Sequence, residues 1–417
     1  MKINTLEHKM NSEITIPRRE KLLSSLKEKD AVILFAATQG KLEKFQQENN
    51  FLYLTGLAIP HAIYFAYKSS TRSAEYLLIE RGSPEREVWE GKVMDKATAS
   101  ELSGIKQVNY IDELSRILSM YCPAINCIHA NIGKQSLDAP LSYAMHRLLP
   151  VRERFPQIEI RDITELLTPL RKIKSEWEIQ QLQRAIDITG KGIMDIWQNS
   201  QPGMMEYELE AMLFYRMQLS GLKHWGFAPI IATGLNAATL HYDKNECQIA
   251  ANDLVLMDVG AANMNYSADI TRCFPISGTF SERQKQVYAA VLRVQKKIIG
   301  MIAPGVKLMD LQTECRALLT EELKALKLIS EDDEVTKYYM HGVSHFLGMD
   351  THDLGGRDAI LESGNVITVE PGIYIPEEQL GVRIEDDVLV IDEGHRVLSQ
   401  NIPKEISEIE EILGERS

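Results

Sequence analysis

Five side chains of the kinds that bind metal ions follow one another in the carboxyl-terminal part of the chain. They are Asp258 in Leu-Met-Asp-Val-Gly, Asp269 in Ala-Asp-Ile-Thr-Arg, His345 in His-Gly-Val-Ser-His, Glu370 in Thr-Val-Glu-Pro-Gly and Glu385 in Arg-Ile-Glu-Asp-Asp. An isolated Asp or Glu in a loop is usually a solvated surface group. These five stand in or beside apolar segments, where an uncompensated carboxylate would be driven to protonate. A pair of divalent cations would neutralise them.

The types of ligand indicate both the metal and the reaction. Four carboxylates and one imidazole suit hard or borderline cations, manganese first, with cobalt, zinc and iron as other candidates. Two ions roughly 3.5–4 Å apart can lower the pKa of a shared water and polarise a carbonyl at the same time. The ligand set therefore predicts a hydrolase.

Length and composition exclude several other classes. At 417 residues the chain exceeds the size at which one core keeps growing, so we expect two domains. A net charge of −13 argues against a nucleic-acid partner. Residues 1–9 contain no apolar run that could serve as a signal peptide, and no later segment has the apolar length of a membrane span. We expect a cytoplasmic enzyme with no membrane partner.

The first third of the chain reads as alternating strands and helices of an α/β domain. Apolar runs predict strands at 31–37, 51–56 and 75–80. The chain changes character near residue 170, where we place a domain boundary. Arg171, Lys172 and Lys174 form the densest basic spot, and we interpret them as a solvated linker.

The remainder of the chain should position the five ligands. Ser175-Glu-Trp-Glu178 is a capping box that opens a long helix, and a second helix follows at 206–219. Strands broken by Gly, Asn and Asp dominate 229–393, with helices near 281–300 and 308–327. One hairpin would place Asp258 beside Asp269, and a second, carrying Glu370 and Glu385, could face the first.

Cysteine and the remaining histidines give weaker signals. The five cysteines are scattered and without a Cys-x-x-Cys pair, so we expect buried, reduced thiols. A lone histidine is most often a paired structural group, and we interpret His61, His129 and His146 in that way.

The motifs together resemble a known family. His341-Gly-Val-Ser-His345, followed by Asp350-Thr-His352-Asp353, is similar to the metallopeptidases of the pita-bread fold, and among them most similar to the Xaa-Pro aminopeptidases, or aminopeptidases P. Arg18-Arg19, 32–37 and 50–56 resemble the amino-terminal domain of that family. The resemblance implies an α/β domain over 1–170 and an α+β catalytic domain of the pita-bread fold over 171–417.

The resemblance also implies how the ligands divide between two ions. Asp258 would chelate one ion, and Asp269 and Glu385 would bridge the two. His345 and Glu370 would complete the shell of the second ion.

Five side chains acquire roles in binding or catalysis by the same resemblance. Glu370 would take the proton from a metal-bridging water or hydroxide as it attacks the peptide carbonyl. His241 and His352 would hold the carbonyl oxygen and stabilise the tetrahedral intermediate. His341 and Arg383 would line the substrate pocket.

The implied substrate is a peptide with proline at its second position. An Xaa-Pro bond is a tertiary amide without an N–H, which ordinary peptidases need for a backbone hydrogen bond. The implied enzyme removes the residue before that bond and forms a homodimer or homotetramer. The close alternative is an Xaa-Pro dipeptidase with the same fold and metals. A third reading is a non-catalytic binding module that keeps the fold but has lost its metals, and the intact ligands at all five positions argue against it. Creatine-hydrolysing relatives use the same fold without metal, and they lack this ligand set.

Two features depart from the family pattern. Phe227 in Gly-Phe-Ala-Pro stands where the family often has Tyr, so a hydroxyl near the site is absent. The connection between His352 and Glu370 is short, which would reshape the rim of the pocket.

Overall fold

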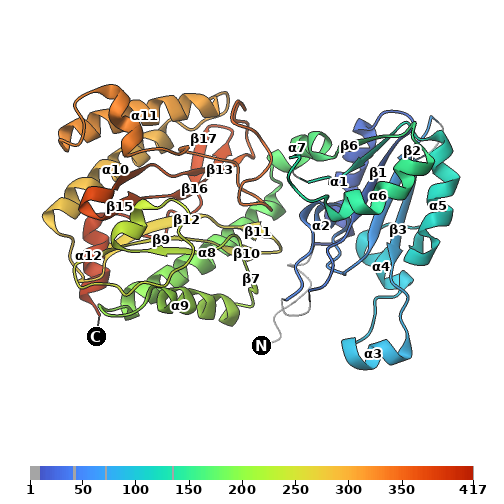
Figure 1. Ribbon diagram of the computed structural model, residues 1–417, viewed down its shortest axis with the longest axis horizontal. Helices are drawn as coiled ribbons and strands as arrows, with labels where there is room; N and C mark the ends of the chain where they lie inside the picture. The colour runs from blue at the N-terminus through green and yellow to red at the C-terminus, as the bar shows by residue number, and fades with distance from the viewer. Residues whose placement is uncertain (1–9, 41–43, 71–72, 134–135, 417) are drawn as a thin grey trace. The chain divides into compact units, whose positions relative to one another are not determined.

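The computed structural model describes residues 10–40, 44–70, 73–133 and 136–416. The chain forms two compact units that divide between Leu170 and Arg171 (Figure 1). Residues 1–9, for which we predicted no signal peptide, lie outside the described residues. Within the described part of the chain, no helix has the length and apolarity needed to cross a membrane.

The amino-terminal unit is built on one six-stranded sheet with the order β4-β3-β2-β1-β5-β6. The central strand β1 (Asp30–Phe35) pairs antiparallel with β2 and parallel with β5. One face of the sheet packs in a core with α5 and α6, because Ile33 and Phe35 of β1 point to that side. The other elements are β2 (Ile63–Lys68), β3 (Ser73–Ile79), β4 (Val108–Tyr110), β5 (Cys127–Ala130), β6 (Glu159–Asp162), α1 (Ser12–Ser25), α2 (Asn49–Thr55), α3 (Pro84–Glu90), α4 (Lys96–Ser103), α5 (Leu114–Tyr121), α6 (Tyr143–Arg154) and α7 (Thr164–Lys172), whose last two residues belong to the carboxyl-terminal unit.

The strand predicted at 51–56 is wrong, because this segment lies in helix α2. The Glu48 carboxylate caps the helix by accepting hydrogen bonds from the backbone N–H groups of Asn50 and Phe51, at 3.0 and 2.7 Å. Gly56 ends it in the left-handed region, with φ of 70°. The helix is buried on every side, so its apolar run carries no periodicity that separates helix from strand.

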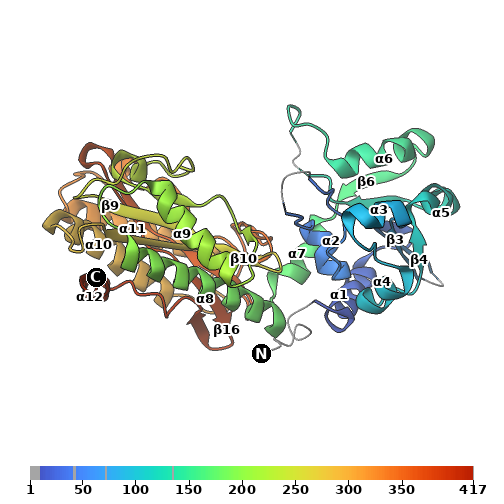
Figure 2. The same cartoon turned by 90° about the horizontal axis from the view of Figure 1, so that it is seen from below.

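The carboxyl-terminal unit has strands between two pairs of helices, α8 with α9 and α10 with α11 (Figures 1 and 2). The strands form the sheets β12-β9-β8, β13-β16-β17, β14-β15 and β11-β10-β7. The helices are α8 (Glu176–Asn199), α9 (Glu206–Leu219), α10 (Glu282–Gly300), α11 (Leu308–Ala325) and α12 (Ile406–Gly414). The strands are β7 (His224–Trp225), β8 (Ile230–Ala232), β9 (Leu254–Val259), β10 (Ala261–Asn263), β11 (Tyr266–Ser267), β12 (Ile270–Pro275), β13 (Val366–Val369), β14 (Gly372–Ile375), β15 (Leu380–Arg383), β16 (Asp386–Ile391) and β17 (Gly394–Val397).

The predicted helix starts and hairpins of this unit are confirmed. Glu178 accepts hydrogen bonds from both the backbone N–H and the hydroxyl of Ser175, at 2.9 and 2.7 Å, which makes the capping box. In the first hairpin Asp258 of β9 stands opposite Thr271 of β12. In the second, β13 pairs antiparallel with β16, so their ends bring the following and preceding glutamates together.

Two smaller predictions are wrong. The segment at 171–174 is not a solvated linker, because the side chains of Arg171 and Lys174 are only 2% and 1% exposed and form ion pairs. Four of the five cysteines are buried as expected, but Cys247 is exposed, since it lies in the loop before β9.

Candidate active site

The five predicted ligands come together in the carboxyl-terminal unit, where the four carboxylates stand at or next to the ends of strands and His345 lies in the segment before β13. Asp258 lies near the end of β9, Asp269 directly before β12, Glu370 directly after β13 and Glu385 directly before β16. The ligand atoms of Asp269, His345 and Glu385 lie within 4.8 Å of one another. His345 Nε2 is 3.4 Å from an oxygen of Asp269 and 3.5 Å from an oxygen of Glu370. We call these five residues the catalytic donor group.

Backbone hydrogen bonds hold the donor segments in register. The N–H of Glu385 donates to the carbonyl of Thr271 at 3.1 Å, which ties the start of β16 to β12. The N–H of Glu370 donates to the carbonyl of Val343 at 2.9 Å, so the segment that carries His345 runs beside the end of β13. The ligands are therefore fixed by sheet pairing rather than by free loops.

The imidazole of His345 is oriented as a metal ligand. Its Nδ1 lies 3.0 Å from the carbonyl oxygen of Phe346, and because a carbonyl only accepts, Nδ1 carries the proton. The lone pair of Nε2 then points toward the oxygens of Asp269 and Glu370, which is repulsive unless a cation lies among them. Burial lowers the pKa of His345 to about 4, which keeps the ring neutral.

The electrostatics of the carboxylates also favour a bound cation. Burial, followed by repulsion from its carboxylate neighbours, raises the pKa of Asp269 and of Glu385 well above the ordinary range. Burial likewise raises the pKa of Glu370 to about 8, although Arg383 opposes the shift. One oxygen of Asp258 is buried without a hydrogen-bond partner within the described part of the chain. Oxygen-rich donors with this surplus of negative charge fit two divalent cations.

A chain of hydrogen bonds through Arg383 holds two members of the donor group, Asp258 and Glu385, in place. Arg383 donates to Asp258 at 2.7 Å, to the Thr271 hydroxyl at 3.0 Å and to the Tyr374 hydroxyl at 2.8 Å. The Thr271 hydroxyl in turn donates to Glu385 at 2.7 Å. The sequence prediction missed Thr271 and Tyr374. The available signal was a tyrosine in a buried strand, where its hydroxyl needs a partner.

The predicted substrate-binding histidine His341 is part of this chain. Its Nδ1 donates to the carbonyl of Gly342 at 2.8 Å, so Nε2 accepts from the Tyr374 hydroxyl at 2.8 Å. Burial, with smaller effects from Arg383 and His241, lowers the pKa of His341 to about 4. Its ring lies 3.7 Å from an oxygen of Glu370, at the edge of the donor group.

The two histidines expected to bind the substrate carbonyl are exposed. The ring of His352 lies edge-on to that of His345, with 4.4 Å between the ring centroids. His241 follows the short helix η3 (Gly234–Ala238), which packs closely on β15: a Cβ on Gly381 would lie 1.9 Å from the Ala237 carbonyl oxygen. Neither histidine lies in the buried layer of the ligands, as expected for groups that meet a substrate.

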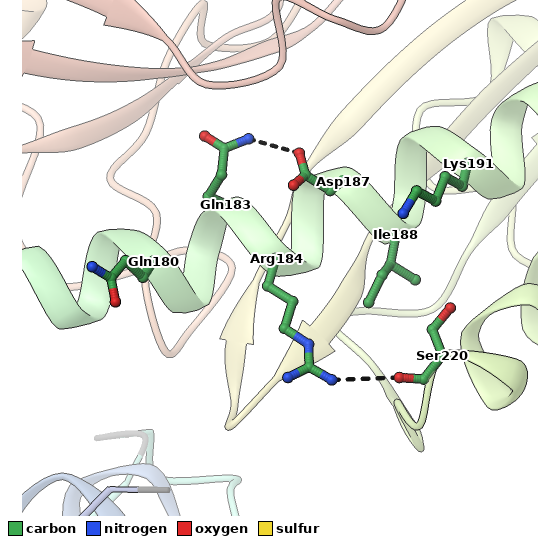
Figure 3. A pocket seen from close by; sticks show the side chains of 7 residues that line it. All are labelled: Gln180, Gln183, Arg184, Asp187, Ile188, Lys191 and Ser220. Carbon is green, nitrogen blue, oxygen red and sulfur yellow. Dashed lines mark hydrogen bonds between the residues drawn. The ribbon is translucent and has the colours of Figure 1, made fainter. Parts of the chain in front are cut away.

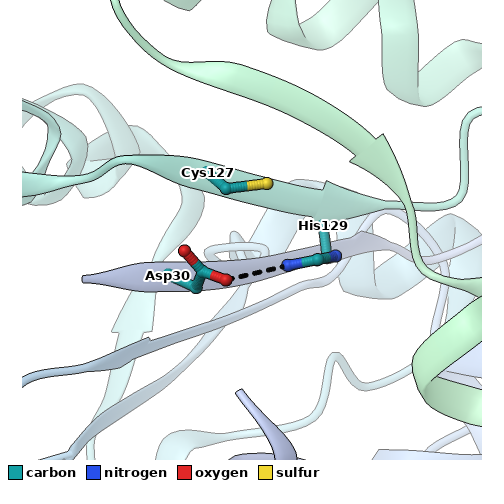
Figure 4. A group of neighbouring side chains, drawn as sticks. All are labelled: Asp30, Cys127 and His129. Carbon is teal, nitrogen blue, oxygen red and sulfur yellow. Dashed lines mark hydrogen bonds and ion pairs between the residues drawn. The ribbon is translucent and has the colours of Figure 1, made fainter. Parts of the chain in front are cut away.

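A second group of metal-type side chains lies in the amino-terminal unit and was not predicted. Asp30, Cys127 and His129, which we call the β1–β5 group, are buried on paired strands (Figure 4). His129 Nε2 lies 3.2 Å from Asp30 Oδ2. Burial, and then the charge of Asp30, raises the pKa of Cys127 to about 11, so the thiol keeps its proton. The pairing agrees with the structural role expected for His129.

A surface pocket elsewhere in the carboxyl-terminal unit contains none of the predicted site residues. It lies along α8 and the end of α9 (Figure 3). Its polar side chains bond to their neighbours: Gln183 donates to Asp187 at 2.9 Å, and Arg184 donates to the carbonyl of Ser220 at 3.5 Å. Nothing in its lining supplies a catalytic arrangement.

Comparisons with known proteins agree with this geometry. The sequence model of metallopeptidase family M24 matches residues 180–392, and that of the aminopeptidase P N-terminal domain matches residues 16–126. The Xaa-Pro aminopeptidase of Haemophilus influenzae is 30% identical over 95% of this chain and 96% of its own length.

Solved structures agree over both units. A Bacillus anthracis protein provisionally described as an aminopeptidase P superposes with a TM-score of 0.94 at 40% identity, covering 98% of this chain and 99% of the other. Escherichia coli aminopeptidase P has been solved with the inhibitor Pro-Leu and, zinc-substituted, with product. These structures give TM-scores of 0.88 and 0.87 at 28% identity, covering 97% of this chain and 99% of theirs. The expected pita-bread fold class is confirmed.

Proposed function

The chain belongs to metallopeptidase family M24, and from that premise we propose that it is an Xaa-Pro aminopeptidase. It would remove the first residue from peptides whose second residue is proline. The observation that carries the proposal is the catalytic donor group, whose four carboxylates and one neutral imidazole converge at strand ends beside two exposed histidines. Relatives named as Xaa-Pro aminopeptidases or aminopeptidases P match both units, which favours this activity over that of a dipeptidase or of a non-catalytic module.

We assign two divalent cations to the donor group, with manganese as the first candidate. Asp258, Asp269, His345, Glu370 and Glu385 would hold the two ions. When bound, the cations would lower the pKa of a water molecule and polarise the substrate carbonyl. The fit rests on the free lone pair of His345 Nε2 and on the raised pKa values of the buried carboxylates.

Glu370 is the proposed carrier of protons. Its carboxylate would accept a proton from the attacking water and return it to the imino nitrogen of proline as the peptide bond breaks. In the chain without cations, burial raises the pKa of this side chain to about 8. Nearby cations would lower that value and keep the carboxylate ready to accept.

His352 and His241 are the proposed donors to the substrate carbonyl oxygen. Both are exposed next to buried groups of the site, where they can reach a bound peptide. Hydrogen bonds to this oxygen strengthen as negative charge develops on it. His341 and Arg383, joined through the Tyr374 hydroxyl, would form the adjoining wall of the pocket.

Acceptance of proline follows from what this site does not require. A carbonyl activated by cations and histidines needs no N–H from the following residue, so a tertiary amide is acceptable. The ring of Phe227 lies close to Gly260, two residues after Asp258, since a Cβ on Gly260 would be 2.9 Å from ring Cε1. Phe227 therefore adds an apolar surface, without a hydroxyl, beside the donor group.

The direct test compares two substrates, Ala-Pro-Ala and Ala-Pro. Metal-stripped protein is assayed with each, before and after manganese is added. We expect cleavage of the tripeptide only when manganese is present. Cleavage of the dipeptide alone would assign a dipeptidase, and cleavage of neither would contradict the proposed substrate class.

Assembly and location complete the proposal. We propose a homodimer or homotetramer, because the family resemblance implies one, and light scattering on the purified protein would decide it. A cytoplasmic location is supported by four buried, unpaired thiols, which are typical of reducing compartments. Fractionation of cells that produce the protein would test the location.

A further inference from the structure

Two cationic side chains from a distant part of the chain bond to the two aspartates that flank His352. Arg171 Nη2 donates to Asp350 and to Asp353, each at 2.6 Å, and Lys174 Nζ lies 3.2 Å from the second oxygen of Asp353. We call Arg171, Lys174, Asp350 and Asp353 the His352 clasp. Arg171 and Lys174 come from the segment before α8, about 180 residues away along the chain.

Three of the four clasp side chains are buried, and the charges of the clasp balance. The side chains of Lys174 and Asp353 are each 1% exposed and that of Arg171 is 2% exposed, whereas Asp350 is 46% exposed and reaches solvent. Two cations face two carboxylates, in contrast to the surplus of carboxylates in the catalytic donor group. Loss of one partner would leave a buried charge uncompensated, so the segment would have to move to hydrate it.

The space around the segment leaves little room for adjustment. A Cβ on Gly348 would lie 1.9 Å from Asp353 Oδ2, and the Asp353 N–H donates to the Phe346 carbonyl at 2.8 Å. The Thr351 hydroxyl donates to the Gly226 carbonyl at 3.1 Å. The residues on both sides of His352 are therefore anchored, while its own imidazole is exposed toward the site.

The other side of the clasp is anchored as well. The Lys174 N–H donates to the Gly364 carbonyl at 2.8 Å, and Asn365 donates to the Lys172 carbonyl at 3.1 Å. Gly364 and Asn365 directly precede β13, the strand that leads to Glu370. The cations of the clasp are thus fixed to the same strand that presents the proton carrier.

We propose that Arg171 and Lys174 are positioning residues, which hold His352 at the angle needed to bond the substrate carbonyl oxygen. The inference rests on the proposed function, because it gives His352 that task. Both cations bond to the aspartates beside His352, and we assign neither of them to the substrate-binding residues or to the metal ligands. Their contribution is the fixed backbone of 350–353, and a shift of about 1 Å at a catalytic group can cost roughly a hundredfold in rate.

The first test separates rate from binding and from metal loading. Arg171→Met and Lys174→Met should each lower kcat on Ala-Pro-Ala by about ten- to a hundredfold, with KM changed by less than about threefold. Manganese content should stay equal to that of the wild type. The matched control is Lys172→Met, which removes a neighbouring cation paired with the exposed Glu362 and should leave kcat unchanged.

The second test asks whether the effect passes through His352. Arg171→Met is combined with His352→Ala, and if Arg171 acts by positioning His352, it should cause little further loss in that background. Equal losses in both backgrounds would overturn the inference, as would wild-type kcat in Arg171→Met. Should that variant fail to fold, Arg171→Lys, which keeps the charge but not the planar fork, enters the same cycle with a smaller expected loss. Inactive wild-type protein would overturn the proposed function instead.

Discussion

The two groups of metal-type donors found in the described part of the chain differ mainly in charge balance. The β1–β5 group has one carboxylate, which pairs with His129, and a thiol that burial keeps protonated. The catalytic donor group has four carboxylates, and Arg383 is the cation that bonds to it within the described part of the chain. Proximity of donors is therefore weak evidence for a metal site. Surplus negative charge that the protein leaves uncompensated is stronger evidence.

The largest expected effect comes from breaking the catalytic donor group at its proton carrier. Glu370→Gln removes a ligand charge and the group that moves the proton, so activity on Ala-Pro-Ala should fall by at least about a hundredfold. Steady-state kinetics at saturating manganese would measure the loss. Near-wild-type activity would remove Glu370 from the role of general base.

His352 should matter for rate but not for metal. His352→Ala removes a donor to the substrate oxygen, and we expect kcat to fall by roughly tenfold to a thousandfold while two manganese ions stay bound. Kinetics and metal analysis of the same preparation would measure both quantities. Loss of manganese from this variant would make His352 a ligand and overturn the assignment.

The charge surplus should also appear in the stability of metal-free protein. The pKa of Glu370 is raised to about 8 in the folded chain, and those of Asp269 and Glu385 are also raised. A carboxyl group whose pKa is higher in the folded chain than in the unfolded chain stabilises the fold when it is protonated. This contribution is complete below the pKa of the unfolded chain, near 4, and it is lost as pH rises through the pKa of the folded chain. Metal-free protein should therefore melt roughly 2–8 °C lower at pH 9 than at pH 6.

Two controls sharpen that measurement. Glu370→Gln should show a smaller difference between the two pH values, because one titrating group is gone. Added manganese should reverse the trend, since the cations bind the ionised carboxylates. A melting temperature of the metal-free protein that rises with pH would contradict the charge surplus.

The smallest effect is expected from a change in the β1–β5 group. Cys127→Ser changes the β1–β5 group while leaving the pair of Asp30 and His129 intact. We expect kcat and the manganese dependence of activity to stay within about twofold of wild type, because this group lies in the other unit. A large loss of manganese activation would show that the two groups are not independent.

The sequence predicted much of this arrangement because the relevant signals are local. Ser175 with Glu178 marks a helix start within four residues, and the apolar runs before Asp258 and Glu370 mark strands that end at ligands. These signals need no knowledge of distant contacts. The convergence of the five ligands followed from hairpin register together with the family resemblance.

The errors arose where contacts between residues far apart in the sequence, or burial in the fold, determine the local structure. The sequence around Arg171 and Lys174 does not indicate that both side chains are buried in ion pairs with Asp353, about 180 residues later. Residues 51–56 are apolar throughout, and the cap from Glu48 with full burial, rather than periodicity, selects the helix. Tyr374 of β14 joins the site because its hydroxyl accepts a hydrogen bond from Arg383 of the neighbouring strand β15.

Metal content tests the comparison most directly. Metal-free protein is loaded with manganese and, in parallel, with zinc, and the ions bound per chain are counted for wild type, His345→Ala and Cys127→Ser. We predict two ions in wild type and in Cys127→Ser, and fewer in His345→Ala. No bound metal in wild type, or an ion lost on Cys127→Ser, would contradict the claim that surplus negative charge, and not the mere proximity of donors, creates the metal centre.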